Sequence, residues 1–222
     1  MNRRLRAQRA VRRGALRWWL VYGPVRSGTT LMANLIAPSA RWLVSDWGLH
    51  AALAGPFAAT GPFDRRRVQR ALMAEVLAAV DSGHGGPVDL VYKQANLRRA
   101  EYDDLVGLFG PPQRRIFCLR DPAGFMSSAV RKFPDVDLDN LQEINYVGTS
   151  VEHDLIGGEV FHYHPAVTGE DYASFLAPLV IPAELRATVR YTGSAAPELA
   201  TEQMWAEYHR LLEKAVNRPA GG

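Results

Sequence analysis

Short apolar runs and longer amphipathic segments alternate along most of the chain. The apolar runs are typical of buried β-strands and occur at 17–23 (RWWLVYG), 41–45 (RWLVS), 88–94 (VDLVYKQ) and 114–120 (RRIFCLR). Segments with helical spacing follow these runs at 27–37, 65–80, 101–109 and 122–132. Strands joined by helices form mostly parallel sheets covered on both faces. We therefore expect an α/β, three-layer fold with a central, mostly parallel β-sheet flanked by helices.

The pattern weakens after residue 132. Segment 133–182 is rich in turn-forming residues, and we expect it to be loop-rich and to contribute the contacts to a substrate. The run ATVRYTG (187–193) predicts a last strand, and 197–216 predicts a C-terminal helix. We expect residues 18–222 to form a single domain, preceded by a basic arm at 1–17.

Composition limits the classes of protein to consider. The chain has 222 residues, 47% hydrophobic and 22% charged, which is ordinary for a globular domain. The single cysteine, Cys118, cannot form an intrachain disulfide, so we expect a reducing, cytoplasmic location. No apolar run approaches the ~20 residues of a membrane-spanning helix, so we expect no membrane span.

The formal net charge of +3 comes from the arm, which holds seven arginines and no acidic residue. The remainder of the chain is slightly acidic, which argues against a nucleic-acid groove. For the arm itself, a solvated helix is the first interpretation. A transit peptide and an arm that docks on an acidic partner are the alternatives.

The stretch VYGPVRSGTTLMANL (21–35) has the glycine spacing of a phosphate-binding loop. Gly23 and Gly28 stand five apart, as in the Walker A pattern, but Thr29 occupies the position of the lysine. A strand, a glycine-rich turn and a helix N-terminus together bind anions through backbone N–H groups. Arg26, inside the turn, supplies the cation, and the hydroxyls of Ser27, Thr29 and Thr30 supply further donors.

A second motif lies ~90 residues further on, in RRIFCLRDPAGFMSSAVRKF. Arg120 ends a predicted strand, Asp121-Pro122 forms a turn, and Ser128 follows in the first turns of a helix. An arginine and a serine at this spacing can converge on one phosphate.

Together the two motifs resemble those of the sulfotransferases that use 3′-phosphoadenosine 5′-phosphosulfate, and the chain resembles a short, divergent bacterial member. The resemblance implies that residues Arg26, Ser27, Gly28, Thr29 and Thr30 bind the 5′-phosphosulfate. It implies that Arg120 and Ser128 bind the 3′-phosphate, that no metal is needed, that the acceptor is a hydroxyl or amine of a small molecule, and that 3′-phosphoadenosine 5′-phosphate is the product.

The chain also departs from the family. The C-terminal Arg-Lys-Gly element that completes the 3′-phosphate site is absent, and Lys214 or Arg218 would have to replace it. The acidic pair that many bacterial relatives have after the arginine-tyrosine strand end does not follow Tyr191. These differences leave open a relative with an altered donor site.

Candidate catalytic residues follow from the resemblance and from the needs of the reaction. Arg26 and Lys93 are the cations expected to stabilise the bridging oxygen of the donor. Ala95 stands where many relatives place the basic histidine. Asp46, twenty residues past Arg26, matches a carboxylate base of carbohydrate-modifying relatives but equally fits a helix N-cap, and His50 is the second candidate.

Two other functions remain open. One is a kinase or nucleotide hydrolase that uses ATP and magnesium, which the missing Walker lysine disfavours. The other is a non-catalytic nucleotide-binding or partner-binding protein. Histidines 153, 162 and 164 suggest a zinc site only weakly, because they lack a recognisable ligand spacing.

Overall fold

The computed structural model describes residues 3–40, 42–45, 74–82, 88–191 and 195–217. Its strands are β1 (Leu16–Gly23), β2 (Trp42–Ser45), β3 (Val88–Ala95), β4 (Arg114–Arg120) and β5 (Glu159–Tyr163). They form one sheet in the order β2-β3-β1-β4-β5, and every pair is parallel. The predicted α/β fold with a central parallel sheet is confirmed.

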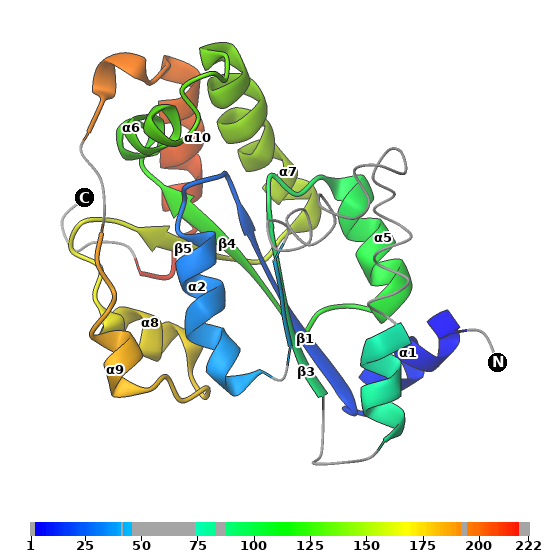
Figure 1. Ribbon diagram of the computed structural model, residues 1–222. Coiled ribbons are helices and arrows are strands. Elements are labelled where there is room, and N and C mark those ends of the chain that lie inside the picture. The colour runs from blue at the N-terminus through cyan, green and yellow to red at the C-terminus, as the bar shows by residue number, and fades with distance from the viewer. Residues whose placement is uncertain (1–2, 41, 46–73, 83–87, 192–194, 218–222) are drawn as a thin grey trace.

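Helices cover both faces of this sheet (Figure 1). The helices include α1 (Arg3–Arg12), α2 (Thr29–Ile36), α5 (Arg99–Phe109), α6 (Pro122–Lys132), α7 (Gly148–Ile156), α8 (Gly169–Leu176), α9 (Ala183–Arg186) and α10 (Glu202–Leu212). A π-helix, η2 (Asn140–Val147), precedes α7, and the short 3₁₀ helices are η1 (Ala37–Ser39) and η3 (Pro197–Leu199). None of the helices formed by the described residues combines the length and apolar character needed to cross a bilayer.

The two faces of β1 belong to two hydrophobic clusters. Trp18, Leu20 and Tyr22 pack with side chains from α1, α5, α6 and α10, whereas Trp19 and Val21 pack with side chains from α2 and α8. This alternation follows from the two-residue period of a strand, and a central strand covered on both sides therefore reads as one apolar run.

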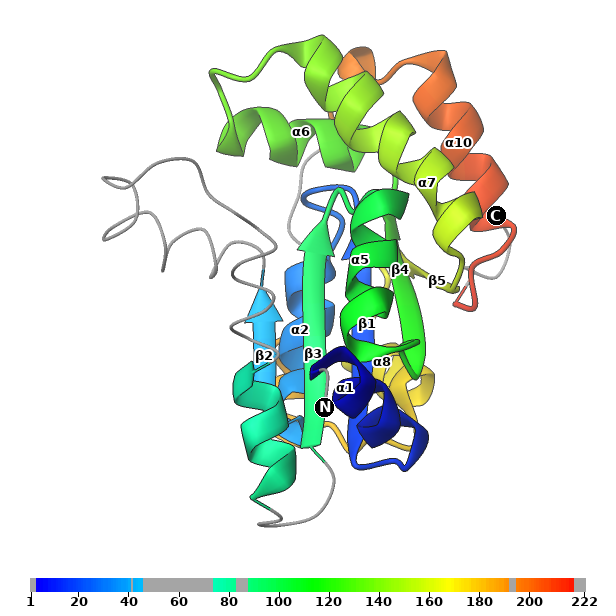
Figure 2. The same ribbon diagram turned by 90° about the vertical axis from the view of Figure 1, so that its right-hand side faces the viewer.

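All five carboxyl ends lie at one edge because the strands are parallel. β1 ends at the glycine-rich turn, β3 at Ala95, β4 at Arg120 and β5 at Tyr163. Figure 2 shows α6, α7 and α10 gathered beyond these strand ends. Loops at this edge of an open α/β sheet are the usual place for a ligand.

Three expectations were wrong. Segment 133–182 is not loop-rich, since it contains η2, α7, β5 and α8. Residues 187–191 form no strand but a turn and an irregular segment. The C-terminal helix is shorter than predicted and begins only at Glu202, where Thr201 caps it by accepting a hydrogen bond from the Met204 N–H.

The basic arm is a helix that packs onto the domain. Ala7 and Ala10 of α1 are buried in the core, while Arg9, Arg12 and Arg13 are exposed. Arg6 pairs with Asp81, and Arg17 at the start of β1 makes two hydrogen bonds, of 2.6 and 2.7 Å, to the Asp89 carboxylate. The predicted helix at 65–80 is helical from residue 74 onward, and its first part lies outside the described residues.

Candidate functional site: an anion-binding pocket at the β1–α2 loop

The turn between β1 and α2 adopts backbone conformations that ordinary side chains rarely tolerate. Gly23 has φ 150° and Gly28 has φ 92°. A Cβ at Gly23 would lie 2.5 Å from the Cys118 carbonyl oxygen, and one at Gly28 would lie 3.1 Å from the Tyr163 ring. Arg26, which is not a glycine, is held at φ 62°. Left-handed backbone at a non-glycine residue is costly and tends to occur at functional sites.

Asn96, which follows β3, holds this loop in place. Its backbone N–H donates to the Gly23 carbonyl (2.9 Å), and its Oδ1 atom accepts from the Val25 N–H (3.2 Å). Its Nδ2 atom donates to Oδ1 of Asn145 in η2. Sequence reasoning missed Asn96 because a single asparagine after a strand has no distinctive pattern; only its place at the shared sheet edge could have indicated it.

The two motifs predicted to act together do lie together. The Arg26 Nε atom donates to the Ser128 hydroxyl (3.0 Å), and an Arg120 NH1 group donates to the Arg26 carbonyl (3.0 Å). Ser128 reaches this point from the second turn of α6, which Asp121 caps by accepting from the Gly124 N–H (2.7 Å). The β1–α2 loop and the β4–α6 connection therefore form one site.

Arg120 is fixed from several sides, although its side chain carries a charge and is only 2% exposed. Its guanidinium carbon lies 4.6 Å from the ring centre of Tyr191 and 5.5 Å from that of Tyr163. Its Nε atom donates to the Tyr191 hydroxyl (3.3 Å), and its backbone carbonyl accepts from Tyr146 (2.6 Å). Rings stacked on a guanidinium stabilise its charge and restrict its orientation. The residues around Tyr163 and Tyr191 form no pattern that indicates contact of these rings with Arg120.

A pocket of about 200 Å³ opens between these elements. Its walls come from the loop, α2 and two strand ends, and consist of Arg26, Gly28, Thr29, Thr30, Leu31, Arg120 and Tyr163. No carboxylate is among these described lining residues. Burial and the nearby charges of Arg120 and Arg131 lower the pKa of the Arg26 guanidinium. A concentration of positive charge beside a helix N-terminus is suited to an anion.

Not every predicted donor-binding or catalytic residue lines the pocket. Ser27 is fully buried, and its hydroxyl donates to the Pro24 carbonyl (2.6 Å), so it stabilises the turn from within. Lys93 lies on β3 in register with Val21, is 6% exposed and does not line the pocket. Asp46 and His50 lie outside the described residues.

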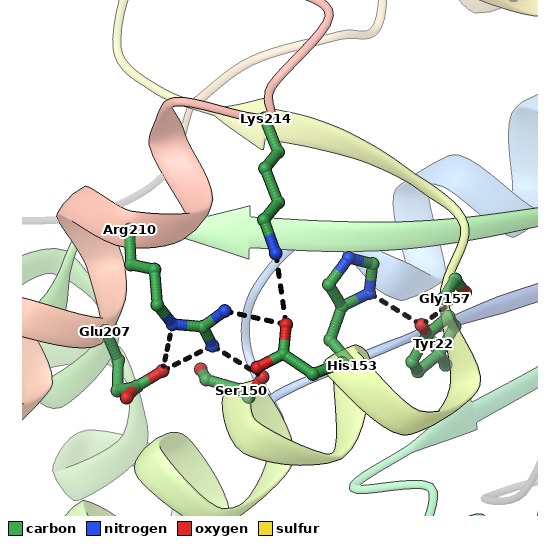
Figure 3. Close-up of polar contacts among 8 residues, drawn as sticks. Tyr22, Ser150, His153, Gly157, Glu207, Arg210 and Lys214 are labelled. Atoms are coloured by element: carbon green, nitrogen blue, oxygen red, sulfur yellow. Dashed lines mark hydrogen bonds and ion pairs between the residues drawn. The ribbon is translucent and has the colours of Figure 1, made fainter.

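Two of the three histidines considered for a metal have separate hydrogen-bond partners. His153 of α7 pairs with Tyr22: its Nδ1 atom lies 2.8 Å from the Tyr22 hydroxyl, which donates to the Gly157 carbonyl (Figure 3). His162 pairs through Nε2 with the Tyr208 hydroxyl at 3.1 Å. Among the residues that the structure describes, no three His, Cys, Asp or Glu side chains gather as a metal-ligand set.

Lys214 does not replace the missing C-terminal element. Its ammonium group donates to Asp154 of α7 (3.0 Å), which also accepts from Arg210 (2.7 Å) (Figure 3). Hydrogen bonds from Lys214 and Arg210 lower the pKa of the Asp154 carboxyl, against the effect of its partial burial. These charges join α10 to α7 and are not directed at the pocket. Arg218 lies outside the described residues.

Comparison with known proteins gives little guidance. Neither the protein-family models nor the curated proteins include a match. Among solved structures, the chain is similar to a sugar kinase from Janibacter sp. (15% identity, 84% of this chain and 99% of that chain, TM-score 0.42). It is also similar to a putative kinase from Chloroflexus aurantiacus (15% identity, 78% and 94%, TM-score 0.37). Likeness at this level does not indicate an activity.

Proposed function

We propose that the protein is a sulfotransferase that moves a sulfuryl group from 3′-phosphoadenosine 5′-phosphosulfate to a hydroxyl or amine of a small molecule. The observation that carries this proposal is the pair of contacts from Arg26 to Ser128 and from Arg120 to the Arg26 carbonyl. They join two anion-binding motifs, and the proposed donor carries an anionic group at each end of its ribose.

The chemistry of the pocket fits a donor that needs no metal. Arg26 lies between the two glycines, where the Walker A pattern requires no cation. Thr29 occupies the position of the Walker lysine. An ATP-dependent enzyme of this fold needs a carboxylate to hold magnesium, and none lines the pocket among the described residues. The cations and backbone N–H groups can instead neutralise a phosphosulfate directly.

The reaction assigns a role to each candidate residue. The acceptor oxygen or nitrogen attacks the sulfur in line with the bond to the 5′-phosphate oxygen, and that bond breaks as 3′-phosphoadenosine 5′-phosphate leaves. We assign to Asp46, with His50 as the alternative, the removal of the acceptor proton. We assign to Arg26 and Lys93 the stabilisation of the negative charge that develops on the departing oxygen. We assign to Arg120 and Ser128 the binding of the 3′-phosphate. Segment 133–182 is assigned the contacts to the acceptor.

Isothermal titration calorimetry with three ligands tests the proposal. We expect 3′-phosphoadenosine 5′-phosphate to bind much more tightly than adenosine 5′-phosphate or magnesium-ATP, because only it presents both anions at the required spacing. Equal affinity for all three would overturn the assignment, and a preference for magnesium-ATP would favour a kinase. Tight binding of the bisphosphate without transfer to any acceptor would point to a non-catalytic binding protein.

A further inference from the structure

Exposed apolar side chains gather on and just before one long helix. Five of the nine large hydrophobic side chains exposed among the described residues lie between positions 136 and 155: Val136, Leu138, Ile144, Val151 and Leu155. The last three are 47 to 56% exposed and belong to the continuous helix formed by η2 and α7. Single exposed apolar side chains are normal, but a cluster of them indicates an interaction surface.

The three apolar residues on the helix share one side of it with Gly148. Ile144, Gly148, Val151 and Leu155 follow one another at intervals of four, three and four residues, which is about one helical turn each time. We call these four residues the outer stripe. The opposite side of the helix packs into the core through Leu141, Tyr146, Val147 and Ile156. A helix that is apolar on opposite sides is typically covered on both, and here only one side is covered.

Neighbouring helices flank the outer stripe and hold it in place. Figure 2 shows α7 with α5 on one side and α10 on the other. The Arg98 guanidinium donates to the Ile144 carbonyl (2.9 Å), and the Arg99 guanidinium donates to the Leu155 carbonyl (2.6 Å). Both ends of the stripe are thus fixed to the start of α5. A surface that has its shape before a partner arrives loses less entropy on association.

The order of residues along the outer stripe makes it complementary to itself. When two copies of a helix pack antiparallel about a two-fold axis, each residue faces the one at the same distance beyond the axis. An axis at the middle of the stripe places Ile144 of one copy opposite Leu155 of the other. The same axis places Gly148 opposite Val151. Large side chains then meet at both ends, and each valine packs on the backbone of a glycine, beside the Arg98 guanidinium.

The charges at the two ends of the stripe match this arrangement. Glu143, next to Ile144, is exposed and has no ion pair with the described residues. Arg99, beside Leu155, pairs with Asp103, but its side chain remains 47% exposed. Because the antiparallel packing brings each isoleucine to the leucine of the other copy, it also brings each glutamate toward the arginine of the other copy. A parallel packing would place like charges together, so the charges favour the antiparallel one.

We propose that the outer stripe is the interface of a homodimer, in which the η2–α7 helices of two copies pack antiparallel about a two-fold axis. The occupant is a second copy of this chain because the stripe matches itself in both shape and charge. One helix pair buries less surface than a standard interface, so the dimer should be weak and form at micromolar concentrations. The inference does not depend on the proposed function, since it uses only the outer side of the helix.

Sedimentation velocity of the whole chain between about 1 and 100 µM tests the proposal. The wild type should shift from monomer to dimer over this range. Ile144→Lys and Leu155→Glu each place a charge opposite an apolar side chain, so each should weaken the dimer by about tenfold or more. Leu5→Glu on α1 is the matched control, because Leu5 is similarly exposed (50%) but lies outside the stripe. All three positions are exposed, and thermal unfolding verifies that the variants are folded.

Mixing the two stripe variants tests the antiparallel arrangement itself. In a heterodimer of Ile144→Lys with Leu155→Glu, the introduced lysine of one copy lies opposite the introduced glutamate of the other. The second end keeps its original apolar contact. An equimolar mixture should therefore contain more dimer than either variant alone at the same total concentration.

Each outcome decides for or against the proposal. Loss of the dimer in both stripe variants, its recovery in the mixture and an unchanged dimer in Leu5→Glu support it. A wild type that stays monomeric up to about 100 µM overturns it and would leave the stripe to a partner of another kind. A dimer that survives both stripe substitutions, or one that Leu5→Glu also abolishes, places the interface elsewhere. Failure of the mixture to recover the dimer contradicts the antiparallel pairing.

Discussion

Arg26 and Ser128 are 102 residues apart in the sequence, yet the Arg26 Nε atom donates to the Ser128 hydroxyl at 3.0 Å. This contact joins the β1–α2 loop to α6, and the Arg120 side chain reinforces it by donating to the Arg26 carbonyl. A ligand that binds one motif is therefore in reach of the other, and substitutions in either should affect the affinity for the same ligand.

Substituting Arg120 should weaken binding of the nucleotide. We expect Arg120→Ala to reduce the affinity for 3′-phosphoadenosine 5′-phosphate by about 2 kcal/mol or more, the scale of a lost charge-assisted hydrogen bond. Calorimetry measures this loss, and Arg12→Ala on the exposed side of α1 is the control. Because Arg120 is buried, circular dichroism must first show that the variant is folded. An unchanged affinity in a folded variant would remove Arg120 from the binding site.

Lys93 should act on turnover more than on donor binding. We assign to Lys93 the stabilisation of the charge that develops during transfer. Lys93→Ala should therefore lower kcat, while the affinity for 3′-phosphoadenosine 5′-phosphate changes little. Steady-state kinetics and calorimetry on the same preparation separate the two effects, with Lys132→Ala at the exposed end of α6 as the control. A parallel loss of affinity and turnover would indicate a binding role instead.

The identity of the general base can be tested at Asp46. Asp46→Asn preserves size and any capping hydrogen bond but removes the basicity, so the variant should bind donor normally and lose about 10²-fold or more in turnover. His50→Gln should have a smaller effect. The reverse order would assign the base to His50. Full activity in both variants would mean that the acceptor needs no base from these residues.

His153 should make the fold sensitive to acid. Burial, with the charge of Lys214 as the next contribution, lowers its pKa to about 4, whereas the unfolded chain has the ordinary value near 6.5. Between these values the unfolded state binds a proton that the folded state does not, so the free energy of unfolding should fall as the pH drops from 6.5 to 4, by up to about 3 kcal/mol.

Urea unfolding of the wild type and of His153→Gln at about pH 7 and pH 4.5 measures this contribution. The variant should be less stable at neutral pH, because the contact with Tyr22 is altered, but should lose less stability on acidification. His209→Gln, on the exposed side of α10, should behave as the wild type does. An identical acid response in all three proteins would show that His153 does not determine it.

Much of the skeleton could be predicted because its strands are apolar runs with glycine or proline near their ends. β4 and α6 begin and end at the predicted residues, because Asp121 caps the helix and Pro122 occupies its first turn. The resemblance predicted that Arg120 and Ser128 approach the loop, because it assigns both motifs to one donor. The physical reason is that parallel strands bring their carboxyl ends to the same edge.

The remaining features carry no local signal. η2 and α7 run continuously from Asn140 to Ile156, but the π-helical part shifts the spacing of apolar residues and Gly148 lies in the middle, so the helical period is hidden. Residues 187–191 alternate like a strand but form none. Asn96, Tyr163 and Tyr191 act through residues distant in sequence, and their roles depend on the assembled sheet edge.

The support that Asn96 gives to the β1–α2 loop has a consequence for the energetics of binding. Asn96 holds Gly23 and Val25 through its own backbone and side chain and is in turn hydrogen-bonded to Asn145 of η2. The loop therefore acquires its shape when the domain folds. An unsupported glycine-rich loop would lose backbone entropy when it binds its ligand, whereas here that loss has already occurred on folding. Affinity at this site is then set by the charges and N–H groups that the loop presents, and a substitution as remote as one in η2 can weaken it by restoring freedom to the loop.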